Sequence, residues 1–136
     1  MQYHIDISGD EHNDFRTSFA KAIAIAIENG TDEIVIAIND IEELDSLIHP
    51  VILGIASKLK KFGSTKIGDV HLYLEIQDKP SAFNSGVIIA AYLTDENLQK
   101  TLIDPRATDT IFVTNNLNTL NSYLSKNKSV ALNNDL

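Results

Sequence analysis

Cysteine is absent from the 136 residues of this chain, which excludes disulfide bonds, zinc–thiolate sites and thiol nucleophiles. Long apolar runs are absent too, since none approaches the roughly 20 residues that a membrane-spanning helix needs. The amino terminus lacks a basic region and begins with a strand pattern, so no signal peptide is expected. These absences predict a cytoplasmic protein with no membrane partner.

Phosphate-binding and serine-activating motifs are also missing. The sequence contains no G-x-G-x-x-G, no G-x-x-x-x-G-K-[ST] and no G-x-S-x-G. Only two arginines, Arg16 and Arg106, are available for bidentate phosphate recognition. We therefore expect no nucleotide cofactor and no α/β-hydrolase nucleophile.

The charge is unbalanced toward acid. The 11 basic and 19 acidic residues give a net charge of −8, which repels nucleic acid at long range. The one basic cluster, Lys58, Lys60 and Lys61, fits the last turns of a helix, where it complements the helix dipole. The expected partner is therefore a basic protein and not a nucleic acid.

Strand and helix patterns alternate along the chain. Period-two or continuous apolar runs predict strands, and apolar stripes predict helices between them. The strands are expected at residues 2–8, 33–39, 70–77, 87–93 and 110–114. The order β-α-β-α-β-β-α-β-α predicts an α/β fold: a three-layer mixed sheet of about five strands with helices on both faces. Residues 1–126 are expected to form one domain, followed by a polar tail at 127–136 that frays.

Two helices have distinct predicted features. The first begins in a capping box of Ser8 and Glu11 and buries Phe15, Phe19, Ile23 and Ile27. The second begins at Asp45 or Ser46, carries Pro50 in its first turn and ends at Gly63. A third helix is expected to start after Thr94, and a fourth after Asn115 or Asn116.

The link between the third and fourth strands, residues 78–85, is short for a parallel crossover. We therefore expect residues 70–77 and 87–93 to pair antiparallel. Tyr73 and Tyr92 would then form a cross-strand pair, and on an open face they would anchor a partner. The strand at 70–77 and the apolar helix at 47–62 are candidate surfaces for a homodimer.

Small polar residues follow most of the strands. Open α/β sheets bind ligands beyond the carboxyl ends of their strands, so these residues are candidates for a ligand site. The alternative is local, because the same residue types also end strands as turn formers and helix caps. The candidates are Asp6, Ser8, Asn39, Asp40, Thr94, Asp95, Asn115 and Asn116.

One segment, Asp6-Ile7-Ser8-Gly9-Asp10, resembles the D-x-S-x-S metal loop of von Willebrand factor A domains over about five residues, with an aspartate at the last serine. The resemblance implies a hard cation held by oxygen ligands. The alternative is local: Ser8 caps a helix, and the following acids favour its dipole. His4 lies on the same strand face as Asp6 and could pair with it for acid–base chemistry.

These observations favour a non-catalytic acidic binding module, self-associating and engaging a basic protein partner, with no cofactor and no assigned metal or catalytic residue. The first alternative is a small metal-dependent hydrolase, phosphoesterase-like, that uses Asp6, Asp40 and Asp95 as ligands. The second is a sensor of a small polar ligand at the same strand ends.

Overall fold

The structure, a computed structural model, describes residues 1–133 apart from the side chain of Leu53. Its centre is a seven-stranded, mostly parallel sheet in the order β3-β4-β2-β5-β6-β1-β7. The strands are β1 (Gln2–His4), β2 (Glu33–Ile38), β3 (Ser64–Ile67), β4 (Val70–Ile76), β5 (Gly86–Ala91), β6 (Ala107–Val113) and β7 (Val130–Ala131). The helices are α1 (Glu11–Glu28), α2 (Ile41–Glu43), α3 (Leu53–Phe62), α4 (Asp95–Leu102) and α5 (Leu117–Lys126), with a π-helical segment η1 (Leu44–Ile48) after α2.

The mixed α/β class is confirmed, but the sheet has two strands more than the sequence predicted. β3 is a four-residue edge strand that pairs antiparallel with β4, and β7 is a two-residue strand that pairs with β1. β3 is short and mostly polar, and β7 has only two residues, so neither shows a strand periodicity. β7 lies in the segment 127–136, which was expected to fray, and residues 134–136 of that segment lie outside the described residues.

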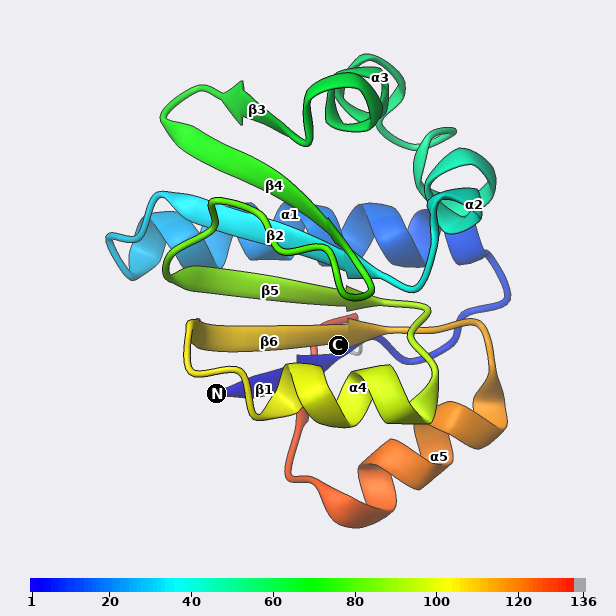
Figure 1. Cartoon of the computed structure of the whole chain (residues 1–136). Helices are drawn as coiled ribbons and strands as arrows, with labels where there is room; N and C mark the ends of the chain where they lie inside the picture. Colours follow the sequence, from blue (N-terminus) through cyan, green and yellow to red (C-terminus); the bar gives the residue numbers. More distant parts are fainter. Residues whose placement is uncertain (134–136) are drawn as a thin grey trace.

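The expected antiparallel pairing of the third and fourth predicted strands is wrong. β4 and β5 lie on opposite sides of β2, and each pairs with it in parallel. The link Asp78–Ser85 crosses over β2 without a helix (Figure 1). Eight extended residues reach about 26 Å, which exceeds the roughly 20 Å length of a six-residue strand. A short link can therefore make this parallel crossover.

Helices cover both faces of the sheet, as Figure 1 shows. On one face, α1 packs on the central strands β2, β5 and β6 through residues such as Phe15, and α3 packs on β3 and β4 through residues such as Leu59. On the other face, α4 and α5 bury Leu98 and Leu120 against β5 and β6. Over β2 that second face has no helix, and Phe83 of the crossover link covers Val35 and Ile88 instead.

The first helix begins and packs differently from the expectation. Its N-cap is Asp10, whose side chain accepts a hydrogen bond from the Asn13 N–H, so Ser8 is not the cap. Ile27 is 66% exposed, whereas Ala22 and Ala26 are fully buried. A stripe taken every fourth residue drifts by about 40° at each step of a 3.6-residue helix, which carries Ile27 off the buried face.

The predicted second helix is interrupted. The chain forms α2 and η1, breaks around Pro50 and resumes as α3. The His49 N–H donates to Leu44 O, five residues back, which is the π-type bond. Proline has no N–H and clashes with the preceding turn, so the helix cannot continue through it. Gly63 ends α3 with φ of 76°, which confirms the predicted stop.

Candidate functional site

The carboxyl ends of β1, β2, β4, β5 and β6 lie at one edge of the sheet, because these five strands are parallel. We call this the carboxyl edge; it is on the right in Figure 1. Chain connections leave β2 and β5 toward opposite faces, so a topological switch point lies between them. The polar residues predicted from the sequence follow these strand ends.

The side chain of Asn39 forms hydrogen bonds with groups on both sides of the switch point. Its Nδ2 donates to Glu43 Oε1 at 2.8 Å and to Tyr92 O at 2.7 Å. Its Oδ1 accepts from Thr94 N at 3.1 Å and from Asn97 Nδ2 at 2.8 Å. The amide therefore joins the end of β2 to the end of β5 and the first turn of α4, which is a structural role.

Three other predicted residues act as helix N-caps. Thr94 caps α4 and Asn116 caps α5. Asp40 forms a capping box with Glu43, as its carboxylate accepts from Glu42 N at 2.9 Å and its N–H donates to Glu43 Oε2 at 3.1 Å. Burial raises the pKa of Glu43 above its ordinary value. The local explanation accounts for all three caps.

The segment that resembles a metal loop is divided between two hydrogen-bond groups. Ser8 Oγ donates to Asp14 Oδ1 at 2.6 Å. Asp6 Oδ1 lies 3.1 Å from Nε2 of the buried His4, whose Nδ1 lies 2.7 Å from Ser129 Oγ. Across residues 1–133, no three His, Asp or Glu side chains come close enough together to hold a metal ion. Asp6, Asp40 and Asp95 therefore do not form the predicted carboxylate cluster.

The other predicted residues also lie apart. Asn115 Nδ2 donates to Glu11 Oε2 at 2.9 Å, at the start of α1. Tyr73 packs with Phe83 on the face covered by the crossover link, and Tyr92 belongs to the core on the opposite face. Because β2 separates their strands, the expected cross-strand tyrosine pair does not form.

Two residues next to the switch point have a left-handed backbone that the sequence did not indicate. Tyr92 has φ of 58° and Asp78 has φ of 62°. Such angles are costly for a large residue and concentrate near functional sites. At Tyr92, the turn lets Ala91 and Tyr92 enter the same core while Leu93 enters the other.

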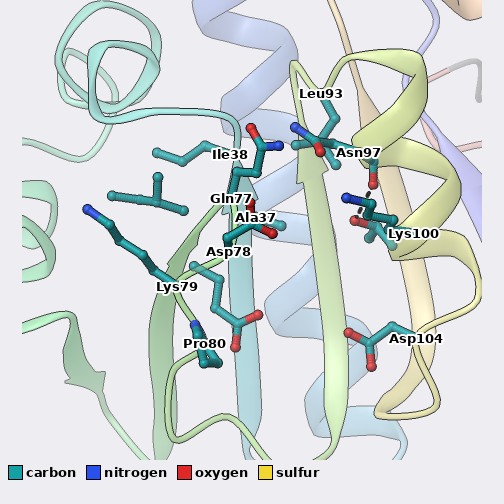
Figure 2. Close-up of a pocket in the computed structure, with 13 residues that line it drawn as sticks. Ala37, Ile38, Gln77, Asp78, Lys79, Pro80, Leu93, Asn97, Lys100 and Asp104 are labelled. Carbon is teal, nitrogen blue, oxygen red and sulfur yellow. Dashed lines mark hydrogen bonds between the residues drawn. The ribbon is translucent and has the colours of Figure 1, made fainter.

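A cavity of about 320 Å³ lies beside the switch point, between the crossover link and α4. Ala37, Ile38 and Leu93 give it an apolar floor. Figure 2 shows Gln77, Asp78 and Lys79 on one side, and Asn97 and Lys100 on the other. Sequence reasoning missed these wall residues. Asp78 follows a strand in the predicted manner, but Gln77 falls within the strand predicted at 70–77, and the others lie on the link or within α4.

A network of ion pairs among Arg106, Glu75 and Asp104 lies at the lower end of this cavity. Arg106 contacts Glu75 through Nη1 and Nη2, both at 2.8 Å, and contacts Asp104 through Nη2 at 2.7 Å. Burial raises the pKa of Glu75, but hydrogen bonds from Arg106 and Ser81 outweigh it and leave the pKa below its ordinary value. The hydrogen bond from Arg106 likewise lowers the pKa of Asp104. Both carboxylates are therefore ionised at neutral pH, and the three charged groups together carry one negative charge.

Fold and site define the class as a mixed α/β protein with a mostly parallel sheet and a polar carboxyl edge. Comparisons with protein-family models, with curated proteins and with solved structures find no match. In the part of the chain that the structure describes, no helix combines the length and apolar character needed to cross a membrane. Function must therefore be argued from the chain's own residues.

Proposed function

We propose that this protein is a non-catalytic binding module whose acidic carboxyl edge engages a basic protein partner. The supporting observation is where the charges lie. Of the 19 acidic residues, 11 follow a strand at this edge or begin the helix after it, and the same segments carry one basic residue, Lys79. The 11 are Asp6, Asp10, Glu11, Asp14, Asp40, Glu42, Glu43, Asp45, Asp78, Asp95 and Glu96.

Several of these acids have local roles as caps, but the exposed remainder sets the field outside the edge. Glu42, Asp95 and Glu96 are exposed, and no capping bond to their side chains is found in the described residues. A surface of one sign accelerates encounter with a partner of the opposite sign and disfavours like-charged partners. A basic protein surface is the partner that this edge fits.

The test compares two triple variants with equal charge change. Glu42→Gln/Asp95→Asn/Glu96→Gln neutralises the edge, and Glu28→Gln/Asp32→Asn/Asp69→Asn neutralises exposed acids elsewhere, each changing the net charge from −8 to −5. Binding of a lysine- and arginine-rich peptide is followed by fluorescence anisotropy over a salt series. We expect salt-sensitive binding that the edge variant weakens more than the control. Equal weakening by both variants, or no salt dependence, would contradict the proposal.

The cavity beside α4 supports a second candidate, a sensor of a small polar ligand. Ligand sites in α/β sheets form at switch points, and this cavity combines an apolar floor with a few polar groups. The metal-dependent hydrolase receives no comparable support, because the three aspartates proposed as its ligands do not converge among the described residues.

A further inference from the structure

We propose that the cavity between the crossover link and α4 binds a small zwitterion of the free amino acid type. This inference rests on the second candidate function, the ligand sensor, and is independent of the basic-partner proposal. The cavity volume of about 320 Å³ is near the lower end of the range for ligand pockets. The apolar floor of Ala37, Ile38 and Leu93 suits a short aliphatic group.

A hydrogen-bond acceptor opens onto this cavity. Asn97 is only 8% exposed, and its Nδ2 donates to Asn39. No donor reaches its Oδ1 from any described residue. Because the described part of the chain has no fully buried side-chain oxygen or nitrogen without a partner, this oxygen must reach open space, and Asn97 lines the cavity. A ligand N–H can supply the donor it lacks.

Opposite charges stand on the two walls. Asp78 is on the link and Lys100 is on α4, across the cavity from it (Figure 2). Among the described residues, the acid closest to the Lys100 ammonium is Glu96, at 4.0 Å, beyond hydrogen-bond distance. A ligand ammonium can therefore face Asp78 and Asn97 Oδ1 while its carboxylate contacts Lys100.

The ion network at the lower end disfavours a purely anionic ligand. Arg106 is engaged by Glu75 and Asp104, so it offers no free guanidinium to a carboxylate. The network's remaining negative charge attracts an ammonium and repels an unaccompanied anion. A ligand with both charges can contact Asp78 and Lys100 on the two walls, and its ammonium is also attracted by the network.

The test uses the full chain and matched ligands. A thermal-shift panel of the free amino acids identifies binders, and calorimetry then compares each binder with its amine lacking the carboxylate and its acid lacking the ammonium. We expect the zwitterion to bind at least about tenfold more tightly than either analogue, since each loses one charge-assisted contact.

Two substitutions connect the binding to this cavity. Asp78→Asn removes the charge while asparagine still tolerates the left-handed backbone, and Lys100→Gln removes the opposite charge. Each should weaken zwitterion binding about fivefold or more, whereas Asp69→Asn and Lys126→Gln, which alter exposed residues outside the cavity, should leave it unchanged.

The outcomes separate the ligand class from the sensor role. Binding of the amine or the acid as tightly as the zwitterion overturns the zwitterion proposal but leaves a ligand sensor. Zwitterion binding that Asp78→Asn and Lys100→Gln do not weaken overturns the location. No stabilisation by any amino acid, with a panel of other small polar metabolites also inactive, overturns both.

Discussion

Asn39 and Asn97 are joined by a 2.8 Å hydrogen bond from Nδ2 of Asn97 to Oδ1 of Asn39, between residues 58 positions apart in the chain. The bond spans the switch point, from the end of β2 to the first turn of α4. It also orients the Asn97 amide so that Nδ2 is engaged and Oδ1 is left for the cavity. One hydrogen bond therefore both joins the end of β2 to the start of α4 at the carboxyl edge and orients a side chain of the proposed ligand site.

Substitution of Asn39 should destabilise the fold strongly. Asn39→Ala removes four hydrogen bonds, including those to Tyr92 O and from Thr94 N, and should lower the free energy of unfolding by about 2 to 4 kcal/mol. Asn39→Asp retains the acceptor but loses the donor and places a carboxylate beside Glu43, so it should be at least as harmful at neutral pH. Urea denaturation measures both.

The control is Asn115→Ala, which removes an exposed amide with one hydrogen bond, to Glu11. It should cost well under 1 kcal/mol. Equal losses for Asn39→Ala and Asn115→Ala would show that the switch-point network contributes little to stability.

Local patterns predicted the elements well where a local cause was sufficient. Thr94 and Asn116 cap the predicted helices, and Gly63 ends α3 in the left-handed conformation. These outcomes depend on a few neighbouring residues, so one sequence is enough to show them.

Pairing between distant segments could not be predicted in the same way. β4 pairs with β2, which precedes it by more than 30 residues in the chain, and not with β5, which follows it directly. The link between β4 and β5 is short enough for a hairpin loop, although it crosses over β2. The cavity depends on that unexpected path, because Asp78 and Lys79 of the link line it on the side opposite α4. The carboxylate cluster failed for a related reason: Asp6 and Asp40 share an edge, but β5 and β6 separate their strands.

Arg106 should stabilise the protein in a pH-dependent manner. Arg106→Met leaves Glu75 and Asp104 partly buried without their guanidinium and should cost about 2 to 4 kcal/mol at pH 7. Both carboxyls have lowered pKa values in the folded protein, so their stabilisation is present above an ordinary carboxyl pKa of about 4 and is lost as the pH falls through the folded values.

The difference between wild type and Arg106→Met should therefore shrink between pH 5 and about pH 2, as followed by urea denaturation across that range. Arg16→Met, which removes an exposed arginine of α1, serves as the control and should show a small difference at every pH. A constant gap between wild type and Arg106→Met at all pH values would contradict the ion-network account.

Gly86 should tolerate no side chain. A Cβ built at this position would lie 2.1 Å from the backbone oxygen of Glu33, so β2 and β5 would have to separate. Gly86→Ala should cost about 3 kcal/mol or more. The same change at exposed Gly54 in α3, where an added Cβ would meet nothing within 4 Å beyond the helix's own backbone and its chain neighbours, should be neutral or stabilise by up to about 1 kcal/mol. Equal thermal stability of the two variants would contradict the close approach.

Tyr92 should limit stability at alkaline pH. Burial raises the pKa of its hydroxyl, and the nearby charges of Glu11 and Asp14 raise it further. In the unfolded chain a tyrosine ionises near pH 10, so the folded state binds this proton more tightly. Its contribution to stability is therefore complete below about pH 10 and is lost as the pH rises further.

Tyr92→Phe should accordingly lose less stability than wild type between about pH 9.5 and pH 11, measured by denaturation at each pH. At neutral pH the variant should remain close to wild type, because the one hydrogen bond of the hydroxyl, to Glu11 O, is long at 3.4 Å. Tyr3→Phe is the comparison, since Tyr3 is only partly buried and its substitution should alter the alkaline limb less. If Tyr92 ionised near pH 10 in the folded protein, absorbance at the tyrosinate band would rise more in wild type than in Tyr92→Phe there without unfolding, and the buried position of this hydroxyl beside α1 would be wrong.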